Sequence, residues 1–284
     1  MRFFTHSSIR QKNNYGYWAV ALGAAAFASY FIYNQFYSSR KIFNDPRKMP
    51  VQLFKPKEQK PNRGLMVLIE GLDLAGKSTL TRQLIEVLEK KNFRARFSRN
   101  AITRENPIAK VADDFRKEAK AGLLETGALF LAAHQYDALK FKEPDKNTIH
   151  IQDSCWLRTL AFHSGHHTRF IPQLIYQTHQ DQPHFDVVIY LTASIEARKI
   201  RVLKREQESN QNDAADYWAY TDPEKVQKLD KILCEKTKEL YPDSYCIDTS
   251  NLTPEKVLEK TLHILKNHLS ELDITRENLC RASI

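Results

Sequence analysis

The sequence lacks the features that mark several classes of protein. Its four cysteines (Cys155, Cys234, Cys246 and Cys280) show no paired short spacing, which argues against a disulfide scaffold and against a zinc ribbon. Excess charge is almost absent from most of the chain: residues 61–284 hold 33 basic and 32 acidic side chains, whereas residues 1–60 hold ten and two. A folded part without a basic surface is not expected to bind nucleic acid.

A second absence, that of any charged residue from Asn13 to Ser39, predicts a membrane anchor. As a helix, residues 15–37 would span about 35 Å, which is enough for a hydrocarbon layer of about 30 Å. Aromatic side chains lie at both ends of this run, as expected at the two membrane interfaces. More basic residues follow the run than precede it, so the positive-inside rule places the C-terminal domain in the cytosol or an equivalent compartment.

Other interpretations of this segment stay open. It could be a cleaved signal peptide, a mitochondrial presequence that continues into an inner-membrane anchor, or a buried helix of the globular domain. We expect a basic N-terminus and a transmembrane helix in residues 1–40, then a proline-rich charged linker in residues 41–63. Small residues recur every four positions in the helix and would let two copies pack as a homodimer: Ala21, Ala25 and Ser29.

The clearest motif follows a short apolar run at residues 65–70, which is typical of a buried parallel strand. Residues 71–78 (GLDLAGKS) match G-x-x-x-x-G-K-[ST], and apolar residues then recur at helical spacing up to Leu88. A strand, this motif and a helix in that order form a phosphate-binding loop. We predict that the loop binds ATP through Gly71, Leu72, Asp73, Leu74, Ala75, Gly76, Lys77, Ser78 and Thr79.

Each part of the motif has a chemical role. Glycines let backbone amides surround a polyphosphate, and the helix N-terminus attracts its negative charge. Lys77 can reach the β- and γ-phosphates, and the Ser78 hydroxyl can ligate Mg²⁺. The loop therefore predicts both ATP and Mg²⁺ as cofactors.

Residues 69–79 are similar to the phosphate loop of the thymidylate kinases, in which an Asp sits two residues after the first glycine, as Asp73 does here. Further segments match the family in chain order: strands at 93–99, 148–152, 185–191 and 244–250, and a helix from 254. The resemblance covers about residues 64–268. It implies an α/β fold, a three-layer P-loop kinase sandwich with a five-stranded parallel sheet, in a domain of residues 64–284 that follows the transmembrane helix.

The resemblance also implies roles for charged residues outside the loop. Asp73 would hold the 3′-hydroxyl of the acceptor sugar, and Arg99, or its rival Arg104, would grip the acceptor phosphate. Asp153 follows a strand beside the loop, where a carboxylate can orient Mg²⁺ or its waters; its alternative role is a helix N-cap. The family's arginine-bearing lid corresponds to residues 201–205, and Arg201 and Arg205 would close over the transferred phosphate unless residues 198–205 are only a solvated helix face.

The acceptor side departs from the family pattern at three places. The family usually has an arginine at or beside His134, an Asp-Arg pair in place of residues 153–154, and a base-reading glutamine in place of His163. Arg158 could substitute for the missing arginine, and Phe130 could stack on a base. These departures argue against thymidylate itself as the substrate. The predicted acceptor-binding residues are Asp73, Arg99, Arg104, Phe130, His134, Arg158 and His163.

Taken together, these features predict a membrane-anchored, ATP- and Mg²⁺-dependent kinase for a nucleoside monophosphate, with catalytic roles for Lys77, Asp153, Arg201 and Arg205. A deoxynucleoside kinase would need a general base, usually a Glu, where the second strand here ends in Arg99. A polyphosphate-dependent kinase stays open, because it combines a similar loop with a nearby Asp and Trp, as Asp73 and Trp156 do here. The non-enzymatic alternative is a nucleotide-binding membrane subunit with an altered acceptor pocket.

Overall fold

The computed structural model describes residues 63–103, 105–117, 122–166, 170–209 and 214–282. The predicted transmembrane helix, the predicted linker up to residue 62, and Arg104 lie outside these ranges. Within them, no helix combines the length and the apolar character that crossing a bilayer requires.

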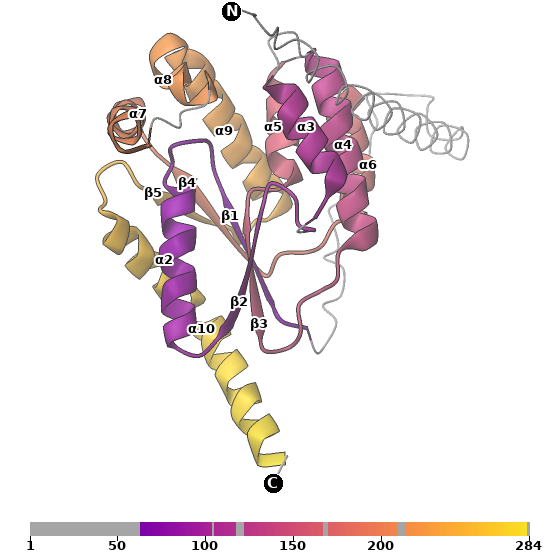
Figure 1. Ribbon diagram of the computed structural model, residues 1–284, viewed down its shortest axis with the longest axis vertical. Coiled ribbons are helices and arrows are strands. Elements are labelled where there is room, and N and C mark those ends of the chain that lie inside the picture. The colour runs from indigo at the N-terminus through magenta and orange to yellow at the C-terminus, as the bar shows by residue number, and fades with distance from the viewer. Residues whose placement is uncertain (1–62, 104, 118–121, 167–169, 210–213, 283–284) are drawn as a thin grey trace, which may run out of the picture.

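A parallel five-stranded sheet forms the centre of the domain, with the strand order β2-β3-β1-β4-β5 (Figure 1). The strands are β1 (Leu65–Glu70), β2 (Arg94–Arg99), β3 (Thr148–Asp153), β4 (Val187–Thr192) and β5 (Tyr245–Asp248). The three central strands are buried along almost their whole length, which is typical of parallel strands covered on both faces. The predicted five-stranded parallel sheet is therefore confirmed.

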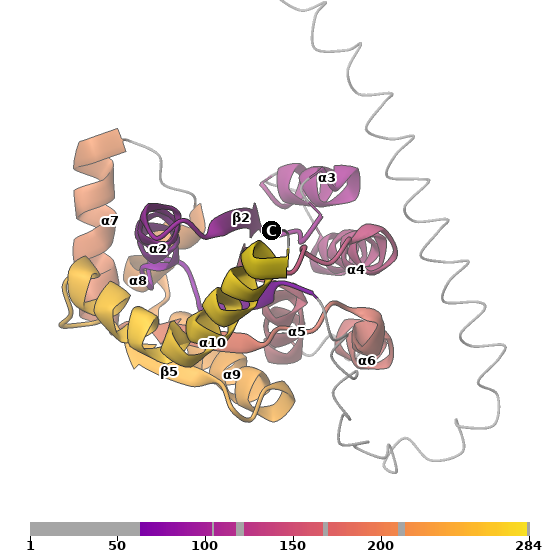
Figure 2. The ribbon, with the colours of Figure 1, turned by 90° about the horizontal axis from the view of Figure 1, so that it is seen from below.

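Helices cover both faces of the sheet and complete three layers (Figure 2). On one face, α2 (Lys77–Lys90) and α10 (Pro254–Ala282) pack on the side chains of Val67, Ile69 and Ile189. The opposite face is covered by α4 (Leu123–Lys140), α5 (Trp156–Gly165), α6 (Phe170–Thr178) and α9 (Pro223–Leu240). Four shorter or peripheral elements are α3 (Pro107–Arg116), η1 (His179–Asp181), η2 (Ala214–Tyr217) and α8 (Trp218–Thr221), and α7 (Ile195–Ser209) follows β4.

Local sequence explains where the helices around the site begin. The Asn106 side chain accepts hydrogen bonds from the backbone N–H groups of Ile108 and Ala109, both at 3.0 Å, and caps α3 ahead of Pro107. Asp222 caps α9 in the same way, through the N–H of Lys225 at 3.1 Å. These caps fix the starting points of two helices at the loop-bearing end of the sheet.

The described chain enters the domain at the amino end of β1, opposite the loop that leaves its carboxyl end. Arg63 forms a bidentate ion pair with Asp186, with N–O distances of 2.6 and 2.8 Å, and its backbone forms an isolated antiparallel β-bridge with Asp145. The N–H of Gly64 donates to the Pro144 carbonyl at 2.8 Å. A chain that arrives from residue 62 therefore reaches the sheet at the end that is remote from the phosphate loop.

Candidate active site

The segment between β1 and α2 has the backbone geometry of a phosphate-binding loop. Gly71 and Gly76 have φ angles of 142° and 99°, in the region that favours glycine, and Leu74 has a φ of 64°. A Cβ atom on Gly71 would lie 2.2 Å from the carbonyl oxygen of Leu191, so close contact with β4 also requires glycine there. Helix α2 begins directly after Gly76, which directs its N-terminus toward the loop.

Lys77 reaches back over this loop. Its side chain is buried, at 6% exposure, and its Nζ donates to the Leu72 carbonyl at 3.0 Å. Burial lowers the pKa of Lys77 and the nearby Arg158 guanidinium lowers it further, whereas the carboxylates of Asp153 and Asp73 act in the opposite direction. The ammonium group therefore lies among charged groups at the loop, where a polyphosphate would offer it better partners than a carbonyl.

Glu70, the last residue of β1, connects the loop to the beginning of α5. Its fully buried carboxylate accepts hydrogen bonds from the backbone N–H groups of Gly71 (2.9 Å) and Cys155 (3.1 Å). Burial raises its pKa. This contact holds the first turn of α5 beside the phosphate loop, so side chains of α5 can reach the nucleotide site.

Two arginines of α7 support the loop from behind. Arg198 is 1% exposed; it donates to the carbonyl oxygens of Asp73 and Ala193, and its Nη2 lies 3.0 Å from Asp230. Arg201 donates to the carbonyls of Leu74 and Thr249, both at 2.7 Å. The alternative that residues 198–205 form a solvated helix face is therefore wrong for Arg198. Sequence reasoning assigned no role to this residue.

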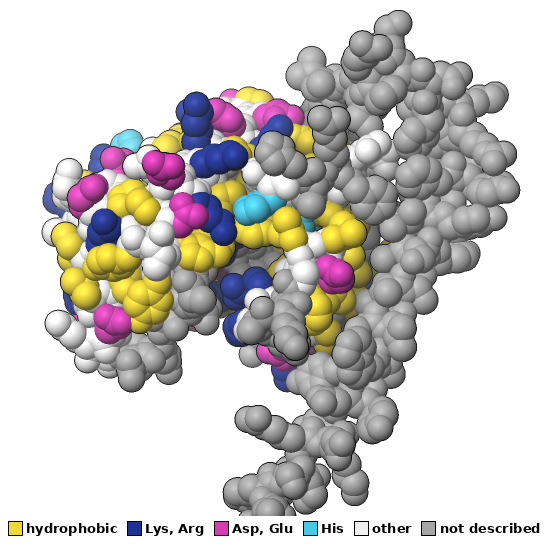
Figure 3. All heavy atoms as spheres, turned by 90° about the horizontal axis from the view of Figure 1, so that it is seen from above, with side chains coloured by type: hydrophobic (Ala, Val, Ile, Leu, Met, Phe, Trp, Pro, Cys, Tyr) yellow, Lys and Arg dark blue, Asp and Glu magenta, His cyan; other side chains and the backbone are white. Residues whose placement is uncertain are grey.

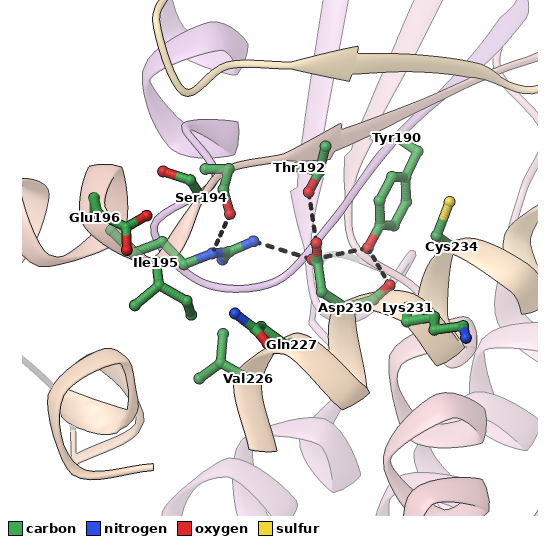
Figure 4. Close-up of a pocket in the computed structure, with 12 residues that line it drawn as sticks. Tyr190, Thr192, Ser194, Ile195, Glu196, Val226, Gln227, Asp230, Lys231 and Cys234 are labelled. Carbon is green, nitrogen blue, oxygen red and sulfur yellow. Dashed lines mark hydrogen bonds and ion pairs between the residues drawn. The ribbon is translucent and has the colours of Figure 1, made fainter. Parts of the chain in front are cut away.

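Asp230 of α9 is the centre of this support. Its carboxylate accepts from the hydroxyl groups of Tyr190 at 2.9 Å and Thr192 at 2.5 Å, and from Arg198, beside a cavity of about 320 Å³ (Figure 4). No local signal marks Asp230, because it lies in a helix with charged residues on both sides.

The two predicted lid arginines have partners within the protein: Arg201 donates to the loop backbone, and Arg205 pairs with Asp216 at 2.9 Å. Their closing over a phosphate stays a prediction.

Asp73 and Arg158 form an ion pair at the mouth of the loop. The Nη2 atom of Arg158 donates to Oδ2 of Asp73 at 2.8 Å, and both side chains are about one-third exposed. Burial acts to raise the pKa of Asp73, but the charges of Arg158 and Lys77 outweigh it and hold that pKa below its ordinary value. The structure thus places Asp73, Lys77 and Arg158 together, three residues that the sequence assigned to the transfer site.

Asp153 ends β3, beside Ile69 of β1, and is 2% exposed. One carboxylate oxygen accepts from the Ser154 hydroxyl at 3.2 Å. The other has no hydrogen-bond partner in the described part of the chain, and the Arg99 Nε lies 3.9 Å from it. Cys155 is the N-cap of α5 and no side chain caps that helix, so the N-cap alternative for Asp153 is wrong.

A buried carboxylate oxygen without a partner fits a hard cation such as Mg²⁺. The exposed Ser78 in the first turn of α2 supplies the second predicted oxygen ligand. Among the described residues, no group of three or more His, Cys, Asp or Glu side chains could hold a metal ion, so a cation here would depend on Asp153, Ser78, the nucleotide phosphates and water.

The two histidines predicted to line the acceptor site are buried between α4 and α5. His134 is 6% exposed, and its Nε2 lies 3.0 Å from the Thr159 hydroxyl. His163 is 2% exposed and packs on Gly127, where a Cβ atom would lie 2.4 Å from its Cε1. Burial lowers the pKa of His134 to about 3 and that of His163 to about 4. Both side chains are therefore neutral at pH 7.

Two further predicted acceptor residues, Phe130 and Arg99, lie in the described part of the chain. Phe130 is half-buried and packs on the small cluster of Ala112, Leu129 and Ala132. Arg99 ends β2 and is exposed. Seen from the carboxyl ends of the strands, the surface is hollowed between two lobes, with Lys, Arg and His side chains at its edge (Figure 3).

Trp156 lies in the core, so it gives no support to a polyphosphate site.

Comparisons with known proteins agree with this geometry. The family model described as thymidylate kinase matches residues 69–258, more than half of the chain. Among solved structures, a thymidylate kinase from Candida albicans that is noted for broad substrate specificity is similar, with a TM-score of 0.56 and 18% sequence identity. That match covers 74% of this chain and 94% of the other, and at this identity it shows the fold alone. No curated protein sequence matches the chain.

Proposed function

Since this chain belongs to the thymidylate kinase family, we propose that it transfers the γ-phosphoryl group of ATP to the phosphate of a nucleoside monophosphate. The observation that carries the proposal is the gathering of Lys77, Asp73, Arg158 and Asp153 at the carboxyl ends of β1 and β3, around a loop with phosphate-binding backbone geometry. Transfer between two nucleotides requires mainly positioning and charge neutralisation, and this set supplies both.

The donor nucleotide would bind through the backbone amides of residues 71–79, with its β- and γ-phosphates replacing the Leu72 carbonyl as the partner of Lys77. Ser78 and the unpartnered oxygen of Asp153 would hold Mg²⁺ or its water ligands. When bound, the cation neutralises charge on the β- and γ-phosphates.

The acceptor would lie on the β2–β3 side of the loop. Asp73 is in position to accept a hydrogen bond from a sugar hydroxyl, and Arg99 at the end of β2 offers an exposed guanidinium for a phosphate. The burial of His134 and His163 supports a base-binding wall that differs from that of the family pattern. We therefore propose a nucleoside monophosphate other than thymidylate as the preferred acceptor.

The proposed enzyme is tethered to a membrane by residues 15–37, with the kinase domain on the cytosolic side; the mitochondrial inner membrane is the alternative. The entry point at Arg63 supports this arrangement, because it lies at the amino end of the sheet and the phosphate loop lies at the carboxyl end. A tether attached there leaves the nucleotide site accessible. Packing of two such helices would make the enzyme a homodimer.

A screen for turnover tests the proposal. The purified full chain with Mg²⁺ and ATP is offered nucleoside monophosphates, nucleosides and polyphosphate in turn, and the products are identified by mass. We expect ADP and a nucleoside diphosphate in equal amounts. A nucleoside monophosphate product would favour a deoxynucleoside kinase. Binding of Mg²⁺-ATP without turnover of any acceptor would favour the alternative, a non-catalytic nucleotide-binding membrane subunit.

A further inference from the structure

Three arginines contact the phosphate loop, and they differ in what remains of their hydrogen-bonding capacity. Arg198 and Arg201 each direct three donor contacts at backbone carbonyls or neighbouring side chains. Both therefore act as scaffold for the loop. Arg158 donates only through Nη2, to Asp73, and its other four N–H groups have no partner in the described part of the chain. Each guanidinium has five N–H groups, so Arg158 keeps four donors for a ligand, against two each for Arg198 and Arg201.

The position of Arg158 suits a phosphate of the donor nucleotide. It is the third residue of α5, whose beginning is attached to the loop through the contact of Cys155 with Glu70. Its charge, with that of Lys77, acts on the carboxyl of Asp73, and it also depresses the pKa of Lys77. Arg158 and Lys77 thus both act on a carboxylate of the loop, where two positive charges would stabilise the negative charge of a phosphoryl group in transfer.

The loop has no cationic side chain between its two glycines. The residues between its two glycines are Leu72, Asp73, Leu74 and Ala75, none of which is cationic. A phosphoryl group in transfer carries negative charge on its three equatorial oxygens, and an arginine that contacts them lowers the barrier substantially. In this chain such an arginine must come from outside the loop.

We propose that Arg158 is the catalytic arginine of the transfer, held in place by Asp73 until both substrates are bound. This inference rests on the proposed function. An oxygen of the acceptor phosphate gives an electron pair to the γ-phosphorus and forms the new P–O bond. The bond from the γ-phosphorus to the β–γ bridging oxygen breaks at the same time, and ADP leaves with the electrons of that broken bond. Asp73 turns to the acceptor hydroxyl, and the guanidinium of Arg158 contacts the equatorial oxygens. The attacking oxygen is already anionic, so no general base is needed.

Steady-state kinetics separate this role from simple acceptor binding. With the acceptor found in the screen, R158M should lower kcat by about 10²- to 10³-fold while KM for ATP and for the acceptor each change by less than about threefold. R158K keeps the charge beside Asp73 but loses the planar fork, and should still lose more than about tenfold in kcat. R96M, which removes an exposed arginine in the middle of β2, is the matched control and should leave kcat unchanged.

A raised acceptor KM with an unchanged kcat would overturn the inference and assign Arg158 to acceptor binding. Equal activity of R158K and the wild type would overturn it as well, because a point charge would then suffice. Should R158M fail to fold, the result for R158K decides, because a lysine at this position can still pair with Asp73.

A second measurement does not depend on knowing the acceptor. ADP with Mg²⁺ and aluminium fluoride mimics the planar phosphoryl group, and the wild-type chain should bind this mixture far more tightly than ADP with Mg²⁺. R158M should lose at least about 100-fold of that gain while its affinity for Mg²⁺-ATP stays within about threefold. Tight binding by R158M, or no gain in the wild type, would contradict the role of Arg158. The turnover screen tests a different claim: no turnover with any acceptor would refute the proposed function, whereas the binding of ADP with Mg²⁺ and aluminium fluoride tests the role of Arg158.

Discussion

The donor and acceptor sides of the site are built in different ways. On the donor side the binding groups are backbone amides, placed by Gly71 and Gly76 and supported from behind by Arg198 and Arg201. On the proposed acceptor side they would be side chains, and two of the predicted ones, His134 and His163, are buried in the contact between α4 and α5. A site made of backbone depends on a few glycines, whereas a site made of side chains can change with each substitution. The resemblance to the family is accordingly clearest in the phosphate loop, and the predicted departures from the family pattern all fall on the proposed acceptor side.

The largest effect is expected from the donor side. Lys77→Met removes the ammonium that reaches over the loop and should lower kcat by at least about 10³-fold, because the charge on the γ-phosphate then has no fixed partner. ADP production under saturating substrates is the measurement. Lys90→Met, at the exposed C-terminal end of α2, is the control and should behave as the wild type. Activity within tenfold of the wild type in the Lys77 variant would refute the assignment.

A smaller loss of activity is expected from a change at Asp153, the carboxylate proposed to hold Mg²⁺. Asp153→Asn removes the charge from the unpartnered oxygen at the end of β3, so the variant should need more Mg²⁺ and lose about 10- to 100-fold in kcat. A titration of activity against Mg²⁺ concentration measures both effects. Asp145→Asn changes a carboxylate that is 85% exposed and should leave the curve in place. An unchanged Mg²⁺ requirement in the Asp153 variant would show that this residue does not serve the cation.

The buried histidines of the acceptor side should make stability depend on pH. Their folded-state pKa values, about 3 for His134 and about 4 for His163, lie below the unfolded value near 6.5, so below that pH the unfolded chain takes up protons that the folded chain does not. Each histidine should cost about 1.6 kcal/mol of unfolding free energy between pH 6.5 and 5.

Urea denaturation at pH 6.5 and pH 5 measures this loss of unfolding free energy. In the His163→Gln variant the loss should be smaller by the amount that one histidine contributes. Because the raised pKa of Glu70 acts in the opposite direction, the difference between the variant and the wild type is the quantity to compare. Equal losses in both proteins would show that His163 is protonated or solvated in the folded state.

The smallest effect tests the fit of His163 against α4. Gly127→Ala places a methyl group 2.4 Å from the imidazole Cε1 and should destabilise the fold by about 1–2 kcal/mol, after the gain in helix propensity is subtracted. Gly165→Ala, whose Cβ would meet only the ends of Leu229 and Ile232 side chains at 3.2 Å or more, is the matched control. In a His163→Ala background most of the cost of Gly127→Ala should disappear, leaving only the looser contact with Ile171 at 3.1 Å; an undiminished cost would show that the contact with His163 is not the cause.

The parts of this molecule that are determined locally could be predicted from the sequence. The strand, glycine loop and helix at residues 65–90 form one continuous segment, and the position of Asp153 followed from its place at the end of an apolar strand. Contacts between distant residues could not be predicted. Asp230 joins Tyr190, Thr192 and Arg198 only because α9 packs beside β4, and no pattern within α9 indicates it.

The histidines also show that contacts between distant residues could not be predicted. The sequence identified positions 134 and 163 as departures from the family pattern, but their burial depends on Thr159 and on the missing side chain of Gly127, which lies 36 residues before His163 in the chain. A single sequence gives no measure of how closely two helices approach. The altered acceptor pocket therefore stays a prediction, and the sequence did not indicate that both histidines are buried.

The central claim is that residues 71–79 bind ATP for transfer to a monophosphate, and mass identification of the products of one reaction tests it most directly. The full chain with Mg²⁺-ATP and a mixture of nucleoside monophosphates should yield ADP and one or more nucleoside diphosphates in equal total amounts, and the Lys77→Met variant should yield neither. Formation of the same diphosphate by the Lys77→Met variant, or tight binding of ATP by the wild type with no diphosphate from any monophosphate, would contradict the claim.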